Sequence, residues 1–516
     1  MNPGFGIIAI TIVCVLTLGI GAFGLRLSRT TSDFYVAGRA VSPGWNASAI
    51  GGEYLSAASF LGVAGLVYSL GIDMLWVPVG YTVGFVVLLV LVAAPLRRSG
   101  AYTLPDFAEA RLESTKVRRL CSVLVVSIGW LYLLPQFQGA GLALRTVTGA
   151  PGWLGGLIVA VVVIANVVAG GMRSVTLVQA VQYWLKLTAI SIPAFLLLWL
   201  WLRQGAPPPR VPPTGLPPES HEWARPLDGF GGHDHPVYAT YSTLLALCFG
   251  TMGLPHVLVR FYTNPDGRAA RRTTLIVIGL LGLFYVFTPV YGVLGRVYLP
   301  TLPQGMNADA VVLMLPSAIS PGLLGEILSA LLAGGAFAAF LSTASGLTIV
   351  VAGVLDQDLL RSRISVRTGG DSVAVQGFRI ASVGAVLVPY AFSQLSVRVG
   401  LADTVGLAFA VAASTFCPLL VLGVWWRRLS TTGATTGLIT GGLLAMSAVL
   451  VTVTGGVQGG WAGALLAQPA AWTVPVAFLV TVLVSIATPS RIPKGTARTM
   501  VRLHTPEDLV LDRSPR

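Results

Sequence analysis

The residues of this chain best suited to hold an ion lie within one strongly apolar segment, residues 334–346, GGAFAAFLSTASG. Ala339, Ser342 and Thr343 stand at positions i, i+3 and i+4, which share one face of a helix. Two hydroxyls and a nearby carbonyl are hard, neutral oxygen ligands that suit an alkali cation, especially beside free carbonyls of an unwound helix. Packing of neighbouring helices through small residues explains the same pattern equally well.

Two ionisable residues also stand in apolar segments. An ionisable group at membrane depth costs at least ~2.5–3.5 kcal/mol, so Glu53 is a candidate for contact with an ion or substrate. It could equally face a water-filled vestibule or pair with Lys186. Lys186 either neutralises a carboxylate or serves a structural ion pair. Gln179 and Gln182, one helical turn apart, either line an ion path or bond neighbouring helices.

A third candidate region is residues 248–263, CFGTMGLPHVLVRFYT, where Gly250, Gly253 and Pro255 interrupt an apolar stretch. In hydrocarbon every backbone N–H and C=O needs an internal partner, so a helix breaks only where it lines a protein cavity. This break therefore predicts a buried polar site. His256 follows it, and either hydrogen-bonds a carboxylate substrate, titrates as a proton site, or holds the break in place.

The elements that position these residues are expected to be membrane-spanning helices. Of the 516 residues, 54% are hydrophobic and only 10% are charged, whereas soluble proteins carry roughly 25% charged residues. The fold class expected is an all-α polytopic membrane protein with about thirteen transmembrane helices. Spans of ~20 apolar residues are expected near 4–24, 47–70, 74–96, 119–147, 152–170, 175–202, 237–260, 273–297, 322–355, 377–395, 401–426, 432–454 and 471–488.

The net charge of +13 follows the membrane topology and does not indicate a nucleic-acid partner. With the N-terminus outside, most of the 33 Lys and Arg residues, Arg260 among them, fall in one set of loops. That asymmetry obeys the positive-inside rule and predicts a multi-pass protein of the cell membrane with a cytoplasmic C-terminus. The first span has basic residues after it and none before it, which favours a retained helix over a cleaved signal peptide.

Two interrupted helices, at residues 45–62 and 248–263, open two groups of five spans, which is typical of an inverted repeat with a site near the midplane. The expected division of the chain has six parts: a peripheral helix (1–30), a first repeat of helices 2–6 (40–202), a Pro-rich extracytoplasmic loop (203–236), a second repeat of helices 7–11 (237–428), peripheral helices 12–13 (429–490) and a cytoplasmic tail (491–516).

Five segments together resemble the sodium:solute symporter family, most closely its acetate and short-chain monocarboxylate permease branch. They are SDFYVAGR (32–39), GEYLSAASFLG (52–62), GGMRSVTLVQAVQ (170–182), GLPHVLVRFYT (253–263) and STASGL (342–347). The resemblance spans about residues 5–490, and GLPHVLVRFYT is its most branch-specific part. It implies thirteen helices and a ten-helix inverted-repeat core that works by alternating access.

The resemblance also implies two sites. Many members of the family carry an Asp at the position of Gln179, a departure that leaves H+ beside Na+ as coupling ion. The implied cation site comprises the carbonyls of Gly52, Leu55 and Ala339 with the hydroxyls of Ser342 and Thr343, and the implied substrate site lies between the broken helices, near Tyr54, Ser56, Ser59, Thr251, Met252 and Gly253, with His256 beside them.

The function expected is secondary active uptake of acetate, propionate or pyruvate with Na+ or H+. The alternatives are symport of an amino acid, sugar or choline, and an anion channel. No nucleotide-binding loop, HExxH motif or GxSxG elbow is present, which argues against an enzyme. The partners expected are the small monocarboxylate and membrane lipid, with no obligate protein partner and no cofactor beyond the coupling ion.

Overall fold

A computed structural model describes residues 3–25, 39–209, 235–303, 306–360, 371–395, 400–455, 459–507 and 509. These residues fold into helices joined by short connections, and no strand occurs among them. The helices are α1 (Pro3–Leu25), α3 (Pro43–Tyr54), η2 (Ala58–Gly62), α4 (Val63–Leu70), η3 (Ile72–Leu75), α5 (Trp76–Leu91), α6 (Ala93–Arg98), α7 (Leu104–Leu112), α8 (Thr115–Thr148), α9 (Gly152–Arg203), α10 (Pro236–Gly253), α11 (Pro255–Phe261), α12 (Gly267–Tyr285), α13 (Thr288–Tyr298), η6 (Ala308–Ala310), α14 (Val311–Ile319), α15 (Leu323–Leu355), η7 (Asp356–Leu360), α17 (Asp371–Leu395), α18 (Leu401–Trp425), α19 (Thr431–Thr454), α20 (Gly460–Ala467), α21 (Ala470–Ala487), η8 (Pro489–Arg491) and α22 (Thr496–His504).

Among the described residues, 10 helices are long and apolar enough to cross a membrane, or up to 12 if each of two bent pairs is one span. One of the ten, α9, has 52 residues, about 78 Å at 1.5 Å per residue, far more than the ~30 Å of a bilayer core. Gly171 interrupts it with φ 59° and ψ −162°, a left-handed conformation that favours glycine. Two helices therefore meet at Gly171, inside the GGMRSV turn. The expected number of thirteen membrane-spanning helices therefore remains a prediction.

The two bent pairs are the helices expected to be broken. Pro43–Tyr54 and Ala58–Leu70 meet at 71°, and Pro236–Gly253 and Pro255–Phe261 meet at 45°. Pro255 lacks an N–H and stands at the start of α11, where a helix needs none. Both breaks therefore fall where the breaker residues predicted them.

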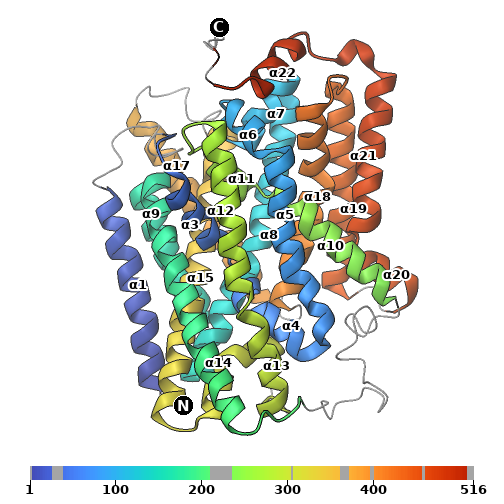
Figure 1. Cartoon of the computed structure of the whole chain (residues 1–516). Coiled ribbons are helices and arrows are strands. Elements are labelled where there is room, and N and C mark those ends of the chain that lie inside the picture. Colours follow the sequence, from blue (N-terminus) through green and yellow to red (C-terminus); the bar gives the residue numbers. More distant parts are fainter. Residues whose placement is uncertain are drawn as a thin grey trace.

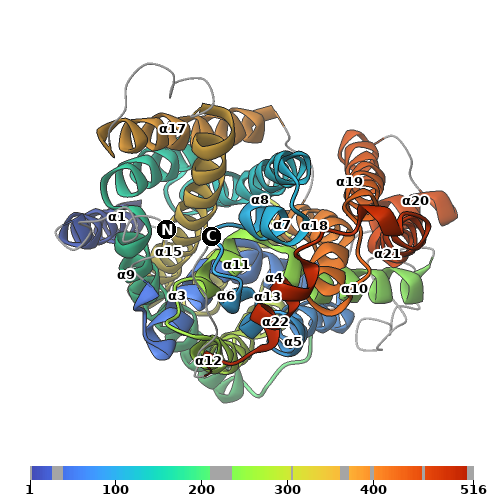
Figure 2. The ribbon, with the colours of Figure 1, turned by 90° about the horizontal axis from the view of Figure 1, so that it is seen from above.

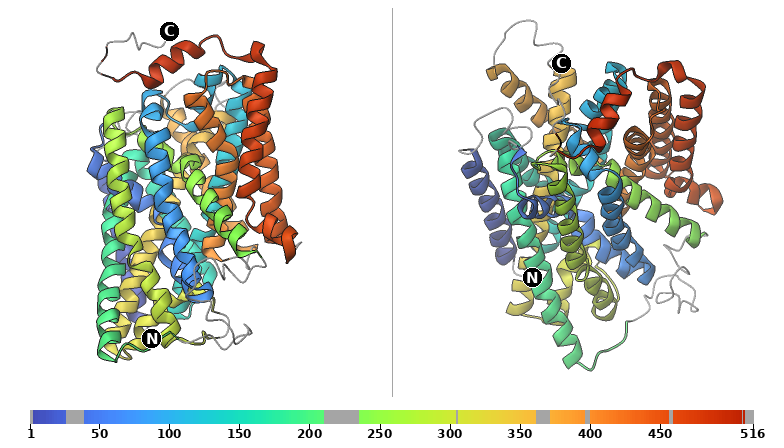
Figure 3. Two further views of the ribbon diagram at one scale, coloured as in Figure 1. Left: turned by 45° about the vertical axis from the view of Figure 1, so that its right-hand side comes forward. Right: turned by 45° about the horizontal axis from the view of Figure 1, so that its top comes forward.

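The broken helices lie inside the bundle. In the view from above, α4 and α11 lie among longer helices, and α1, α17 and α19 lie at the edge (Figure 2). Helix α3 lies between α9 and α12, and its residues from Asn46 to Tyr54 are buried. In the most apolar window of α15, 94% of residues are buried, against 28% for α1. The side views place the two chain ends at opposite ends of the bundle (Figures 1 and 3). The bundle therefore positions α3, α11 and α15 away from lipid.

Helices α10 and α18 are packed backbone to backbone. A Cβ atom added at Gly250 would meet the carbonyl of Phe409, and one at Gly253 would meet that of Ala412. The glycines and the carbonyls are each spaced i, i+3, so two successive contacts repeat along the helix pair. The glycines of the second broken helix thus serve a close approach as well as the break.

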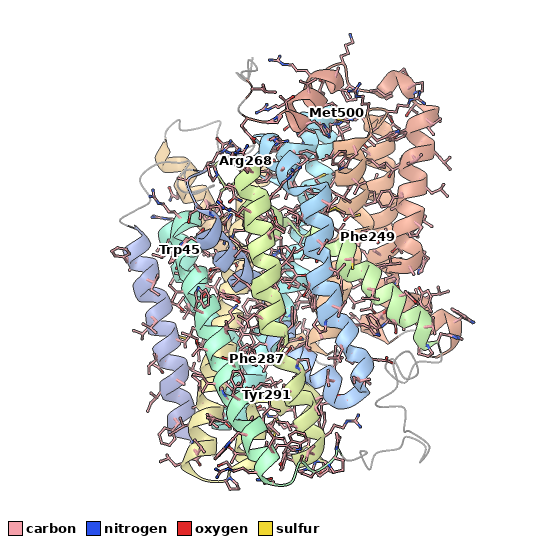
Figure 4. The ribbon with its side chains drawn as sticks, in the orientation of Figure 1. Trp45, Phe249, Arg268, Phe287, Tyr291 and Met500 are labelled. Carbon is pink, nitrogen blue, oxygen red and sulfur yellow. The ribbon has the colours of Figure 1, made fainter. Side chains whose placement is uncertain are left out.

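The segment expected to be a plain tail contains a docked helix. Met500 and Leu503 of α22 are buried, and Met500 lies at the end of the bundle that carries the C-terminus (Figure 4). Glu507 forms an ion pair with Arg98 at 3.3 Å and accepts a hydrogen bond from the Gly267 N–H at 2.8 Å. The tail therefore holds α6 and the start of α12 together.

The α10–α18 contact predicts the effect of one methyl group. Gly253→Ala should lower the free energy of unfolding by about 1–3 kcal/mol, because a backbone carbonyl cannot move aside as a flexible side chain can. Thermal unfolding of the purified protein in detergent measures this. The matched control is Gly279→Ala on α12, where nothing lies within 4 Å of the added Cβ. Equal stability of the two variants would contradict the close packing.

Candidate functional site

The residues expected to bind the cation converge where α3 ends against α15. The Ser342 hydroxyl lies 2.7 Å from the Gly52 carbonyl oxygen and 3.0 Å from that of Ala339. The Thr343 hydroxyl donates to the Glu53 carbonyl at 2.6 Å. Because α3 ends at Tyr54, the carbonyls of its last turn lack hydrogen-bond partners within the helix. The two hydroxyls of α15 donate hydrogen bonds to these carbonyls.

Lys186 of α9 reaches the same oxygens. Its side chain is fully buried, and Nζ donates to the carbonyl of Gly52, to that of Leu55 at 2.8 Å and to the Ser342 hydroxyl at 2.6 Å. The backbones of α3 and α9 approach closely here, since a Cβ at Gly52 would meet the Gln179 carbonyl. Lys186 thus contacts three of the five residues expected to form the cation site.

Glu53 is paired with Arg260, not with Lys186. Arg260 Nε donates to Glu53 Oε2 at 2.5 Å, and both side chains are at most 2% exposed. The other guanidinium nitrogens donate to Thr176 Oγ1 at 2.6 Å and to Gln179 Oε1. Hydrogen bonds of this kind offset part of the desolvation cost of buried ions, although Glu53 Oε1 has no hydrogen-bond partner among the described residues. Arg260 therefore joins α11 to both α3 and α9.

The two glutamines differ in surroundings. Gln179 accepts from Arg260 and donates to the Ser342 carbonyl at 2.7 Å, so it connects the ion pair to α15. Gln182 donates to Thr17 of α1 at 2.9 Å, which is the helix-bonding alternative. Arg260, expected in a cytoplasmic loop, is buried instead. Its position four residues after His256, on the same helix face, is the sequence signal that places it inside.

Three of the expected substrate residues are joined by hydroxyl contacts between the broken helices. Tyr54 of α3 lies 2.9 Å from Thr251 of α10, oxygen to oxygen, and donates to the Tyr81 carbonyl at 3.3 Å. Ser59 of η2 lies 2.8 Å from the Tyr285 hydroxyl. The rings of Tyr81 and Tyr285 stack at 5.9 Å between centroids. Tyrosines of α5 and α12, which sequence reasoning missed, therefore complete this cluster.

The remaining expected residues are buried nearby. Ser56 lies in the break of the first helix, and Met252 and Gly253 form the end of α10. The His256 ring stacks on Tyr132 with centroids 5.1 Å apart. Neither ring nitrogen of His256 has a hydrogen-bond partner among the described residues. His256 is thus an unsatisfied polar group next to the break.

A cavity of about 360 Å³ opens beside this cluster and is lined by Leu70, Tyr81, Leu247, Asp403 and Gln468, among others. It lies between α4, α10 and α18, at the end of the bundle where the N-terminus lies (Figure 1). Tyr81 belongs both to the cavity wall and to the hydroxyl cluster. Tyr81 therefore connects the cavity wall to the hydroxyl cluster.

A buried titratable group lies behind the wall of this cavity, because its partner Leu401 stands between the lining residues Gly400 and Ala402. Asp309 of η6 is buried and accepts from the Leu401 N–H at 3.3 Å. Burial, which disfavours the charged carboxylate, raises the pKa of Asp309 to about 6. A change of pH across this value alters the charge behind the cavity wall.

The opposite end of the bundle is closed. Asn46 of α3 donates to the Arg260 carbonyl at 3.0 Å, and the Val41 N–H donates to the Thr263 carbonyl at 3.3 Å. Arg97 of α6 donates to the carbonyls of Asn264 and Pro265. These bonds hold the turn after α11 against the neighbouring helices.

The chain is similar in sequence to known transporters. The model of the sodium:solute symporter family matches residues 34–441. An uncharacterized symporter, YwcA of Bacillus subtilis (strain 168), is 32% identical over 479 residues, which is 90% of each chain. That name specifies no solute, so it does not assign the chain to the acetate permease branch.

Solved structures share the fold at low sequence identity. A Na+-coupled sialic acid symporter in a substrate-bound outward-open state has a TM-score of 0.70 and 14% identity, over 93% of this chain and 98% of that chain. A nucleobase-cation-symport-1 family transporter, MHP1, in a closed conformation has a TM-score of 0.57 and 12% identity, over 92% and 99%. The fold is thus that of a polytopic transporter, not of an enzyme. By its sequence, this chain belongs to the sodium:solute symporter family.

Proposed function

We propose that this symporter imports a short-chain monocarboxylate such as acetate, propionate or pyruvate across the cell membrane by alternating access. The cavity end of the bundle faces outside, and the C-terminus is cytoplasmic. Residues between the broken helices, with Tyr54, Ser59 and Thr251 among them, would contact the solute. The cation would be held by oxygens of Gly52, Leu55, Ala339, Ser342 and Thr343.

The observation that carries this proposal is the charge balance at the break. Glu53, Arg260 and Lys186 are the charged side chains that meet between α3, α9 and α11, and all three are buried. With each in its ordinary ionised form they sum to one positive charge. A single positive charge in a low-dielectric interior favours an anion of one negative charge nearby. A monocarboxylate supplies that charge, whereas a neutral sugar or cationic choline does not.

The polar groups near the break suit a small acid. The Tyr81 hydroxyl and the His256 ring nitrogens have no hydrogen-bond partner among the described residues. Buried polar groups without partners are costly, and a carboxylate would accept from the Tyr81 hydroxyl and from the ring nitrogen of His256 that carries a proton. The stacked rings of Tyr81 and Tyr285 separate the hydroxyl cluster from the cavity, as an occluding layer does.

The coupling ion has two candidates. The family is named for sodium, and the sialic acid symporter of similar fold is Na+-coupled, so both point to Na+. The proton remains the alternative, since Gln179 lacks the carboxylate that many family members carry at this position. An anion channel fits less well, because the contacts of Asn46, Val41 and Arg97 hold the turn after α11 against the neighbouring helices at one end of the bundle.

Counterflow into proteoliposomes tests the substrate class. Labelled pyruvate should exchange with unlabelled acetate, propionate and pyruvate, and not with propionamide, which has nearly the same shape as propionate without its charge. The panel should include an amino acid, a sugar and choline. Exchange driven equally by propionamide would contradict recognition of the carboxylate, and flux that persists without solute inside would favour a channel.

The buried ion pair predicts a coupled change in stability. Arg260→Met and Glu53→Gln should each cost about 3–5 kcal/mol of unfolding free energy, because each leaves an imperfectly compensated partner. The double variant should lose less than the sum of the two. Thermal denaturation in detergent measures all three. Arg272→Met, at an exposed position of α12, is the control and should stay within about 0.5 kcal/mol. Strict additivity would argue against the pair.

A further inference from the structure

The position of Lys186 bears on the cation site itself. Its Nζ donates to the carbonyls of Gly52 and Leu55 and to the Ser342 hydroxyl. These are three of the oxygens expected to surround a Na+ ion. The other two residues of the expected set adjoin them, since Ala339 is in contact with Ser342 and Thr343 follows Ser342 in the chain.

We propose that the ammonium group of Lys186 is a tethered cation that takes the place of Na+ at this site, so that transport does not require Na+ there. The binding part of this proposal stands on the geometry around Lys186, and its transport part rests on the proposed monocarboxylate symport.

The number of N–H donors on the Lys186 ammonium equals the number of oxygen acceptors around it. An ammonium group has three N–H donors and no acceptor, and Lys186 Nζ has three oxygen acceptors around it. Two are carbonyls at the C-terminal end of α3, where the helix dipole favours a positive charge. Na+ would need the same oxygens at closer range. The ammonium and the ion therefore cannot occupy the site together.

The sum of the charges beside the break also favours the Lys186 ammonium over Na+ at this site. Glu53 is already neutralised by Arg260 at 2.5 Å, so Lys186 supplies the single excess positive charge beside the break. Adding Na+ while Lys186 stays charged would raise the excess to two, which one carboxylate cannot balance. The tethered ammonium with one bound anion gives a neutral centre.

Other titratable groups lie around Lys186, and the test must leave their protonation unchanged. They are Glu53 on α3, Arg260 on α11, Tyr183 on α9 itself and Tyr291 on α13, which donates to the Ile190 carbonyl. The charged residue of α15 is Glu326 in its first turn, and α1 carries none. Asp309, behind the cavity wall, has a pKa raised to about 6 by burial. The experiment therefore changes the ion at constant pH.

Ion-dependent unfolding of the full chain in detergent tests the site. Replacing KCl by NaCl should leave the Tm of the unmodified protein unchanged. Lys186→Ala removes the ammonium and frees three oxygens, so Na+ should raise its Tm in a saturable way relative to K+, since a ligand that binds the folded state stabilises it. Lys116→Ala, at an exposed position of α8, should behave as the unmodified protein does.

A saturable Na+ shift in the unmodified protein would overturn the proposal. So would the absence of any Na+ shift in a folded Lys186→Ala variant. If Lys186→Ala does not fold, the unmodified protein still decides between the two, because Na+ either stabilises it or does not.

Uptake measurements separate this proposal from the proposed function. Pyruvate uptake by the unmodified protein, corrected for protein-free liposomes, should proceed in choline chloride under an inward proton gradient and should be unchanged by Na+. Uptake that requires a Na+ gradient would overturn the tethered cation while the monocarboxylate function stands. Loss of pyruvate uptake under every gradient would remove the substrate assignment, and the Na+ shift of Lys186→Ala would still judge the site.

Discussion

A helix broken inside a membrane must find new partners for its backbone, and the centre of this protein follows from that requirement. Where α3 stops at Tyr54, its last carbonyls are met by Ser342, Thr343 and Lys186 from two other helices. The break thus decides which residues must stand on α9 and α15. It also explains why α15, which supplies the two hydroxyls, is the most deeply buried span.

Charge is the second requirement, and Arg260 satisfies it. A buried carboxylate without a partner would be neutralised or would destabilise the fold, so Glu53 needs a cation within reach. Arg260 provides one and uses its remaining donors on Thr176 and Gln179 of α9. The side chain of Arg260 thus stabilises the ion pair, while its backbone carbonyl accepts a hydrogen bond from Asn46 of α3.

The breaks and the apolar spans could be predicted, because each leaves a local mark in the sequence: a glycine or proline, or an apolar run. The convergence of α3 with α15 was expected only from the resemblance to the family, since a helix face of hydroxyls does not identify its partner. Which buried charged side chains pair with one another could not be predicted. Glu53 has two basic candidates far apart in the chain, and its pairing with Arg260 over Lys186 depends on the bend between α10 and α11. Tyr81 and Tyr285 left no pattern to mark them, since a tyrosine in a span looks the same whether it faces lipid or a cavity. The docked helix α22 was missed because it is short and polar.

The paired glycine contacts of α10 and α18 limit how the protein can move. Gly250 and Gly253 rest directly on the carbonyls of Phe409 and Ala412, without side chains between the two backbones. Sliding one helix along the other would drive carbonyl oxygens into the neighbouring Cα atoms at each step. Helices α10 and α18 must therefore travel as one rigid body. Relative movement is then left to the other contacts of this pair, those of α10 with α5 and of α18 with α19.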